Sequence, residues 1–395
     1  MKITGIIAEY NPFHRGHAYH IQKAREMGAT HIVVVMSGNF TQRGEPALLP
    51  KAVRTRAALA GGADLVVELP TPWAMATAER FVMGGVSILH GMGCVDNLCF
   101  GSECDDIGTL AAIAAYTATD IYKEKLRAAL DSGISYPSAV AAAMDNPAFA
   151  AVLDNPNDTL GVEYCRALQT LHSPITPQTV LRVGAAHDGS TVGEMASAKI
   201  IREGLREGKD ITPYIPTETL PIVKQAIQNG HCLTDTVTAD KIILSHLRLY
   251  TKEQLAYLPA VSEGLENRLY TALRECSTLQ QALEQTKTRR YTAARLRRIV
   301  TAAYIGLHRE TEQQTPPYIR ILGVGKNGAD ILKKMKDTAT LPLFSDATQP
   351  PADALSKEIF ATECKACDLY GSLLSTPLPC GREFTSGVAR YPAEI

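Results

Sequence analysis

Short apolar runs alternate with longer amphipathic segments over the first two hundred residues. The apolar runs occupy residues 3–10, 31–37, 63–70 and 97–103. The amphipathic segments 16–27 and 50–62 lie between them, and each stops at a glycine. Uninterrupted apolar runs of this length predict buried strands, and the segments between them predict helices.

Strands that alternate with helices predict an α/β fold with a doubly wound parallel sheet. A late strand at residues 179–183 and a helix that begins near Ser197 complete an expected N-terminal domain of residues 1–205. Within it, Asn157 or Asp158 is the expected N-cap of another helix. In such sheets ligands bind beyond the carboxyl ends of the strands.

The pattern changes after residue 205. Residues 206–315 carry helical spacing and many charges, which predicts a helical domain. An apolar run returns at residues 318–324, so we expect residues 316–395 to form a small C-terminal α/β region.

Two histidines stand where the first strand gives way to the first helix, in the sequence HRGH at residues 14–17. A helix N-terminus carries unpaired amide donors and partial positive charge that attract phosphate, and Gly16 leaves room for a nucleotide to approach the backbone. Histidines in the first turn can donate hydrogen bonds to a phosphate as charge builds during in-line attack. The sequence therefore favours nucleotide chemistry, with His14 and His17 as candidate catalytic residues.

Two other interpretations of this pair stay open. In one, the histidines cap a helix and do nothing more. In the other, they bind zinc, which is the weaker alternative because no third ligand lies at a recognised spacing. Neither the G-x-G-x-x-G motif nor the G-x-x-x-x-G-K-[ST] motif occurs in this region.

Composition narrows the class of protein. Hydrophobic residues make up 45% and charged residues 21% of the chain, as in ordinary soluble domains. No apolar stretch reaches the roughly 18 residues of a membrane span, and nine scattered cysteines are typical of reduced thiols. We expect a cytoplasmic protein without membrane association, with Cys364 and Cys367 structural and no bound metal. The net charge of −1 limits any nucleic-acid surface to a local patch.

The strand–HRGH–helix arrangement resembles the HxGH nucleotidyltransferase superfamily. A second signature of that superfamily is a loop rich in Ser and Thr that ends in Arg at a helix start. The segment ASAKIIR at residues 196–202 resembles it, which implies a phosphate loop with Ser197, Lys199 and Arg202. Lys199 stands where Ser or Thr is commoner, and a lysine there can reach a β- or γ-phosphate as a point charge.

A longer set of motifs resembles the tRNA(Met) cytidine acetate ligase family. In chain order these are AEYNPFHRGHAYHI, VMSGNFTQRGEPA, GADLVVELP, FGSE, PNDTLG and KTRRYTAARLRRI. The resemblance implies an ATP-dependent ligase that forms acetyl-adenylate and acetylates N4 of the wobble cytidine of elongator tRNA(Met). ATP, Mg²⁺, acetate and that tRNA are then the expected cofactors and partners. The oligomeric state stays open, with a homo-oligomer as one alternative.

Carried over by motif, the resemblance also implies the nucleotide contacts. They are Ile7, Ala8, Glu9, Tyr10, Asn11, Pro12, Phe13, His14, Arg15, Gly16, His17, Ala18, Tyr19 and His20, together with Gly101, Asn157 and Arg182. Gly101 at a strand end would let an adenosine lie against the backbone, Asn157 can donate and accept, and Arg182 can pair a phosphate. A turn glycine, a helix cap and a surface arginine are the structural alternatives.

Basic residues gather in further segments. Arg43 and Glu45 in GNFTQRGEPA (residues 38–47) are candidates for binding a substrate or a magnesium-linked phosphate, or the segment is a plain connection. For the basic residues of the next helix start, Lys51, Arg54 and Arg56, we expect a solvated face.

The segment KTRRYTAARLRR predicts a basic helix that contacts RNA through Arg290, Arg297 and Arg298, with a charged surface helix as the alternative. Residues 318–336 add a second basic stretch. Two other functions remain as alternatives. A small-molecule nucleotidyltransferase would keep the histidines but need no basic helical domain, and a non-catalytic RNA-binding protein would keep only the fold.

Overall fold

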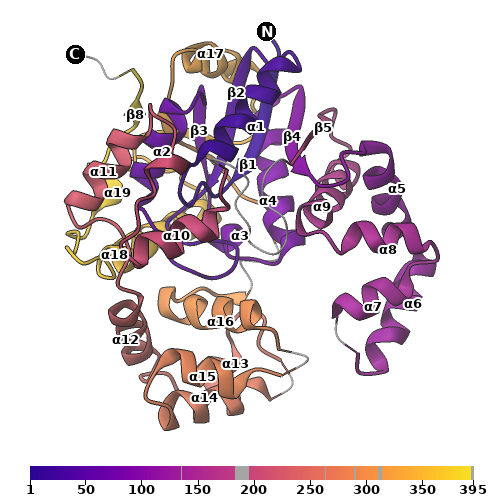
Figure 1. The fold of residues 1–395 in the computed structure, drawn as a ribbon, viewed down its shortest axis with the longest axis vertical. Helices are drawn as coiled ribbons and strands as arrows, with labels where there is room; N and C mark the ends of the chain where they lie inside the picture. Colours follow the sequence, from indigo (N-terminus) through magenta and orange to yellow (C-terminus); the bar gives the residue numbers. More distant parts are fainter. Residues whose placement is uncertain (135, 183–194, 263, 289–290, 310–313, 393–395) are drawn as a thin grey trace.

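A mostly parallel sheet forms the centre of the molecule in the computed structural model, which describes residues 1–395 except 135, 183–194, 263, 289–290, 310–313 and 393–395 (Figure 1). Its parallel strands are β1 (Ile3–Ala8), β2 (His31–Ser37), β3 (Leu65–Leu69), β4 (Asn97–Ser102) and β5 (Thr176–Leu181). They lie in the order β5-β4-β1-β2-β3, which confirms the predicted fold class. Strand order reverses at β1, so the carboxyl ends of β1 and β4 flank the switch point where ligands bind in such sheets.

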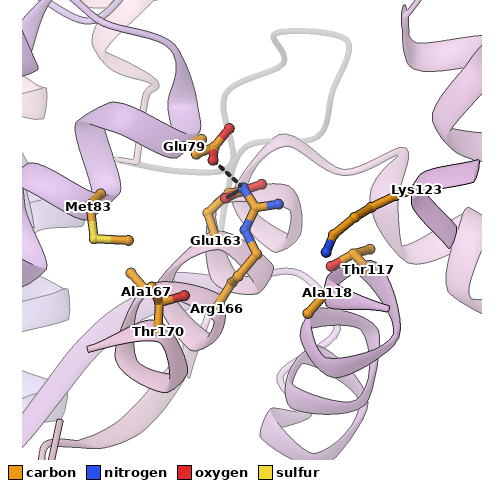
Figure 2. A pocket seen from close by; sticks show the side chains of 9 residues that line it. All are labelled: Glu79, Met83, Thr117, Ala118, Lys123, Glu163, Arg166, Ala167 and Thr170. Atoms are coloured by element: carbon orange, nitrogen blue, oxygen red, sulfur yellow. Dashed lines mark hydrogen bonds and ion pairs between the residues drawn. The ribbon is translucent and has the colours of Figure 1, made fainter. Parts of the chain in front are cut away.

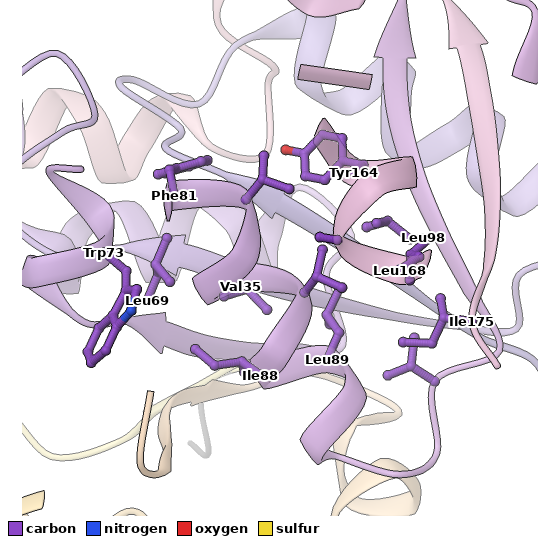
Figure 3. Packing of buried hydrophobic residues seen from close by; sticks show 14 of the residues in the cluster. Val35, Leu69, Trp73, Phe81, Ile88, Leu89, Leu98, Tyr164, Leu168 and Ile175 are labelled. Atoms are coloured by element: carbon purple, nitrogen blue, oxygen red, sulfur yellow. The ribbon is translucent and has the colours of Figure 1, made fainter. Parts of the chain in front are cut away.

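Helices cover both faces of this sheet. One face carries α1 (Arg15–Glu26) and α2 (Lys51–Ala60), and the other carries α4 (Ala78–Gly91) and α9 (Pro156–Thr170). Successive strand residues point to opposite faces. Val34 therefore packs in the core below α1 and α2, whereas Val35 packs with Leu89 and Leu168 on the opposite side (Figure 3).

The sequence of residues 73–90 predicts one helix, but the structure has two, α3 (Thr71–Ala74) and α4, because the chain leaves the helix at Met75 and restarts after Thr77. The predicted N-cap of α9 is also wrong. The helix begins at Pro156 with Asn155 as N-cap, since proline suits the first helical position. Asp158 instead accepts a hydrogen bond from Ser102 Oγ at 2.5 Å.

A helical arm is inserted between β4 and α9. It consists of α5 (Ile107–Ala118), α6 (Asp120–Asp131), α7 (Tyr136–Ala143) and α8 (Pro147–Leu153). The arm projects at the lower right of Figure 1. Residues 107–145 are rich in alanine and carry helical spacing, which predicts this helical character.

The helical character predicted after residue 205 is confirmed, whereas the domain boundaries remain predictions. A second core joins α12 (Thr236–Leu247), α13 (Lys252–Ala256), α14 (Leu265–Glu275), α15 (Leu279–Thr286) and α16 (Ala293–Ile305). Before it come α10 (Ala198–Arg206), a 3-10 turn (Thr212–Tyr214) and α11 (Leu220–Gln228). These pack against Leu48, Leu49 and Val53, and so against the sheet domain.

The C-terminal α/β segment extends the N-terminal sheet. Its elements are β6 (Ile319–Val324), α17 (Gly328–Thr338), β7 (Leu343–Phe344), α18 (Ala354–Gly371), α19 (Arg382–Thr385) and β8 (Ala389–Arg390). β6 pairs antiparallel with β3, and β7 and β8 pair with β6. The basic helix α17 lies at the end of the molecule opposite to α16 (Figure 1). None of the helices in the described ranges combines the length and the apolar character that crossing a membrane requires.

Candidate active site

His14 and His17 form a reciprocal cap at the N-terminus of α1. His14 Nδ1 accepts a hydrogen bond from Gly16 N at 3.0 Å, and His17 Nδ1 accepts one from His14 N at 3.3 Å. The two rings stack with their centroids 3.7 Å apart. Because Nδ1 is the acceptor in each ring, the proton of each neutral imidazole lies on Nε2. The cap therefore leaves one Nε2–H donor on each ring for a ligand at the helix N-terminus.

Gly16 is needed for this cap in addition to any ligand. A Cβ at this position would lie 2.9 Å from Cε1 of His14, closer than side chains pack. The glycine that the sequence assigned to nucleotide approach thus also lets the His14 ring fold over the first turn. Substitution of Gly16 would displace the His14 ring.

Burial and neighbouring cations keep both imidazoles uncharged. Burial, then Arg182 and Arg202, lower the pKa of His14 to about 3. Burial, then the histidines on either side of it, lower the pKa of His17 well below its ordinary value. The pair therefore consists of neutral hydrogen-bond donors, and a bound phosphate would raise both pKa values because negative charge favours the imidazolium.

The loop before α1 packs against the histidines and is itself held by two other segments. The Tyr10 ring lies 4.7 Å from the His17 ring, between centroids. Asn11 Oδ1 accepts a hydrogen bond from Leu48 N at 2.7 Å, and the carbonyl of Asn11 accepts one from Arg202 at 2.8 Å. Contacts from two other segments therefore fix the start of the nucleotide-binding span.

The other members of the predicted span lie around this loop. Tyr10, Asn11, Pro12 and Phe13 are buried, whereas Ile7, Ala8, Glu9, His14, Arg15, Gly16, His17, Ala18, Tyr19 and His20 are half-buried. Arg15 donates a hydrogen bond to the carbonyl of Pro213 at 2.7 Å. His20 Nε2 lies 3.3 Å from Cys99 Sγ, and burial followed by Arg182 lowers the pKa of His20 to about 4.

Gly101, Asn157 and Arg182 lie together, as the resemblance implies. Arg182 donates a hydrogen bond to Asn157 Oδ1 at 2.9 Å. A Cβ at Gly101 would lie 3.2 Å from Cγ of Arg182, so the glycine gives the arginine its path across the strand end. Gly101 lies in β4 opposite Val180 of β5, and His20 of α1 lies 3.3 Å from Cys99 of β4, so this group lies on the same side of the sheet edge as the histidines. Arg182 accordingly lowers the pKa of His14 and His17.

Glu103 belongs to this group and was missed in the sequence. Its carboxylate accepts a hydrogen bond from Asn157 Nδ2 at 2.5 Å and lies 3.6 Å from Arg182 Nε. It therefore fixes the orientation of the amide and balances the charge of the arginine. The available signal was the last letter of the FGSE motif, which the sequence analysis used only for its glycine.

The three residues of the predicted phosphate loop have different surroundings in the structure. Ser197 is the N-cap of α10 and accepts from Ile200 N at 3.4 Å. Arg202 reaches the histidine loop through its hydrogen bond to Asn11. Lys199 is 71% exposed and lies 3.8 Å from Glu203 on its own helix, so the structure brings Arg202 to the histidines but not Lys199.

The basic segment before and within α16 has mixed roles. Arg290 lies outside the described residues. Arg295 donates a hydrogen bond to the carbonyl of Ala260 at 2.7 Å and therefore supports the helical region itself. Arg297 is 40% exposed and lies 3.7 Å from Glu45, and Arg298 is half-buried.

The solvated face predicted for residues 50–62 is wrong for Arg54, which is fully buried. Its guanidinium donates hydrogen bonds to the carbonyls of Glu9 at 2.6 Å, Leu49 at 3.0 Å and Ser37 at 3.2 Å. Arg54 thereby ties the ends of β1 and β2 together. Arg56 is exposed, as expected.

The prediction is also wrong for Lys51, because distant segments supply buried partners. Lys51 Nζ lies 2.5 Å from Glu68 on β3 and 2.6 Å from Glu383 on α19. Arg320 on β6 lies 2.9 Å from the same Glu68 and 2.6 Å from the same Glu383. Burial, followed by the Glu68 carboxylate, raises the pKa of Glu363 beside them. With Glu363 protonated, the two cations balance the two remaining carboxylates.

Cys364 and Cys367 lie on α18, where burial raises the pKa of both thiols, that of Cys364 to about 12. Protonated thiols are poor nucleophiles and poor metal ligands, which fits the structural interpretation. Across the described ranges, no three or more His, Cys, Asp or Glu residues gather as a metal site would require.

A cavity of about 280 Å³ lies elsewhere, between α4, α9 and the start of the helical arm (Figure 2). Its charged lining is largely paired within itself, since Arg166 binds Glu163 and lies 3.5 Å from Glu79. None of the predicted site residues lines it. The cavity is therefore separate from the histidine site.

A parallel sheet whose order reverses at β1, with a histidine pair at the switch point, defines a nucleotidyltransferase. The family described as HIGH Nucleotidyl Transferase matches residues 1–382. The tRNA(Met) cytidine acetate ligase of Clostridium acetobutylicum is 37% identical over 92% of this chain and 94% of its own length. That of Acetivibrio thermocellus is 35% identical over 98% and 99%. This chain therefore belongs to the tRNA(Met) cytidine acetate ligase family.

Solved structures agree over nearly the whole chain. Thermotoga maritima TmcAL bound with alpha-thio ATP superimposes with a TM-score of 0.91 at 32% identity and covers 99% of both chains. The apo form gives a TM-score of 0.93 at 33% identity and covers 99% of this chain and 100% of that chain. The family predicted from the motifs is thus confirmed.

Proposed function

We propose that this protein is an ATP-dependent acetate ligase that acetylates N4 of the wobble cytidine of elongator tRNA(Met). The names of its relatives and the alpha-thio ATP bound to the Thermotoga maritima protein support this proposal. The observation that carries it is the neutral pair His14 and His17, whose Nε2–H groups remain available at the N-terminus of α1 between Arg182 and Arg202. Such a site binds and polarises a phosphate without supplying a nucleophile.

In the first step, an acetate oxygen forms a bond to the α-phosphorus of ATP while the bond to pyrophosphate breaks. The negative charge that develops on the phosphate oxygens is met by His14, His17 and the two arginines. In the second step, the N4 amine forms a bond to the acetyl carbon, the bond to AMP breaks, and the amine loses a proton. Two half-buried carboxylates belong to the same region: Glu103 lies 3.6 Å from Arg182 Nε, and Glu9 follows directly after β1.

Magnesium fits this site as an ion carried by the nucleotide. Mg²⁺ keeps several waters and binds substrate phosphates through few protein ligands. A site built from histidines and arginines, with isolated carboxylates such as Glu9 at its edge, suits that mode. The ion would neutralise part of the phosphate charge.

The experiment that tests the proposed function supplies purified protein with labelled acetate, ATP, Mg²⁺ and total tRNA, and then separates the nucleosides. Label in N4-acetylcytidine, from elongator tRNA(Met) alone, is expected. Pyrophosphate release with no label in any RNA would show a different acyl acceptor. No acetate-dependent release of pyrophosphate at all would contradict the adenylation step.

A further inference from the structure

The loop of residues 38–47 joins the nucleotide-binding segment to the helical region. Gln42 N donates a hydrogen bond to Glu9 Oε1 at 2.8 Å. Two residues further on, the carbonyl of Gly44 accepts one from Thr301 of α16 at 2.7 Å. Gly44 has a φ of +75°, and a Cβ there would lie 2.5 Å from the backbone nitrogen of Arg298. Close packing therefore fixes this loop to α16.

Arg43 stands between these two anchors. Its side chain is exposed, and no hydrogen bond or ion pair joins it to another residue of the described chain. The anchors on both sides fix the backbone of Arg43 without using its side-chain donors. Its guanidinium is therefore available to a ligand outside the protein.

Arg206 has the same character on α10. It lies one turn after Arg202, and residues four apart share a face of a helix. Arg202 is half-buried and turns to Asn11 in the histidine loop, whereas Arg206 is exposed and forms no hydrogen bond or ion pair within the described residues. One helix thus carries an inner arginine at the ATP site and an outer arginine beyond it.

Arg297 of α16 completes the group from the other side. Its contact with Glu45, at 3.7 Å, is long and partly exposed, so it is weak and easily exchanged. Glu45 lies two residues after Arg43, so this contact joins α16 to the loop that carries Arg43. Burial raises the pKa of Asp240 of α12, and Arg297 and Arg206 both oppose that rise, which agrees with a position of both arginines near Asp240. The three arginines therefore border one region between the ATP site and the helical region, which we call the outer arginine group (Arg43, Arg206 and Arg297).

We propose that the outer arginine group binds the sugar–phosphate backbone of the RNA beside the nucleotide that receives the acyl group. This inference rests on the proposed function. Guanidinium groups match phosphate oxygens with two donors each, and a phosphodiester adds negative charge to a group in which, among the described residues, Arg297 alone has an ion-pair partner. The phosphates of ATP are the other source of the same chemistry. They are met by the inner residues, whereas the outer arginines are the exposed ones.

The proposal implies that the RNA and the ATP-derived intermediate are bound close to each other. α10 contacts the loop before the histidines through Arg202 and carries Arg206 four residues later. The loop of residues 38–47 contacts Glu9 through Gln42 and carries Arg43 at the next position. RNA held by the outer group would therefore lie next to the acetyl-adenylate. Both phosphate sites are built on the same elements, so their separation is fixed by the fold.

The test uses Arg43→Ala, Arg206→Ala and the double variant of the full chain. The matched control is Lys333→Ala with Lys336→Ala, which removes two exposed charges of α17 at the opposite end of the molecule. Binding of an elongator tRNA(Met) transcript is measured over a range of NaCl concentrations. The KM for ATP is measured from acetate-dependent pyrophosphate release without RNA.

Each outer variant should weaken tRNA binding by about 5–10-fold and reduce the salt slope by about one. Arg43→Lys should recover part of the affinity, because it restores the charge but not the two-donor geometry. Unchanged affinity and slope in the double variant would overturn the proposal, and so would a KM for ATP raised about tenfold with unaltered RNA binding. An equal loss in the α17 control would show general attraction only and would also overturn it.

This experiment distinguishes failure of the inference from failure of the proposed function. If wild type acetylates tRNA and the double variant binds and acetylates it equally well, only the outer arginine group is refuted. If wild type releases pyrophosphate but neither binds nor acetylates tRNA, the proposed function itself fails, and this inference fails with it.

Discussion

Positive charges serve different purposes on the two sides of the loop of residues 38–47. On its inner side, Arg54 and Lys51 are buried, and their donors are used on carbonyls and carboxylates of the same chain. On its outer side, Arg43 and Arg206 are exposed and have no such partners among the described residues. The comparison teaches that residue type and local pattern do not decide the role of a cation. The partners that the fold supplies decide it.

The two sides should also respond differently to solvent conditions. Exposed charges are screened by salt within about 10 Å at 0.1 M, whereas buried pairs are screened much less. Removal of one member of a buried pair leaves an uncompensated charge in the interior, while an exposed pair contributes little. Variants on the inner side should therefore affect stability, and those on the outer side should affect RNA binding.

The largest effect is expected from Glu68→Gln, because this carboxylate holds both Lys51 and Arg320. Loss of its charge should lower the free energy of unfolding by about 3–5 kcal/mol, measured by urea denaturation, with little dependence on salt. Glu79→Gln is the matched control, since this glutamate is 63% exposed in its ion pair with Arg166. Equal, small effects of the two substitutions would remove the distinction between inner and outer charges.

The histidines are uncharged in the free protein, so their proposed contribution is as hydrogen-bond donors and not as cations. His14→Ala and His17→Ala should each reduce the rate of acetyl-adenylate formation by about 10²–10³-fold, because each removes one hydrogen-bond donor to the transition state. The loss should be nearly independent of salt. Pyrophosphate release with ATP and acetate is the measurement, and the exposed His308→Ala is the control. Wild-type rates in both variants would refute their catalytic assignment.

Titration of the same histidines should appear in the stability of the free protein. Burial lowers the pKa of His14 to about 3 and that of His20 to about 4, below the ordinary value of about 6.5 in an unfolded chain. The unfolded chain therefore takes up protons first, and stability present above pH 6.5 is lost as the pH falls towards 4.

Between pH 6.5 and 5, each histidine should lower the free energy of unfolding by about 1.5 kcal/mol. Urea denaturation across this window measures the slope, and His20→Gln should make it shallower than in wild type. Parallel curves for the two proteins would show that His20 is not held neutral in the fold. Saturating ATP should also flatten the slope, because phosphate charge raises the pKa values of His14 and His17.

The smallest effect is expected from Glu45→Gln. This substitution releases Arg297 from its exposed pair and removes one negative charge beside the outer arginine group. An exposed pair is worth about 0.2–1 kcal/mol, so tRNA should bind about two- to threefold more tightly, measured by equilibrium titration at low salt. Weaker binding would show that Glu45 itself contacts the RNA.

Much of the fold could be predicted because its signals are local. The strand at residues 31–37 is uninterrupted and apolar, and the structure places β2 at the same residues. The pairing of β6 with β3 could not be predicted, since it joins segments about 250 residues apart in an antiparallel arrangement that no turn specifies.

The candidate site divides in the same way. His14 and His17 could be predicted because the residues that form the helix cap lie within four positions of the sequence. The burial of Lys51 depends on Glu68 and Glu383, which are remote in sequence, so the local charge pattern indicated a solvated face. Arg43 and Arg206 of the outer arginine group have no local sequence feature that distinguishes them from other exposed cations.

The most direct test of the central claim measures the two half-reactions in sequence on one preparation. The enzyme is first given ATP, Mg²⁺ and labelled acetate without RNA, freed of small molecules by gel filtration, and then given elongator tRNA(Met). The account predicts pyrophosphate release in the first stage, label retained by the enzyme, and transfer of that label to cytidine N4 in the second stage. Pyrophosphate release that begins only when tRNA is added, or retained label that never enters RNA, would contradict it.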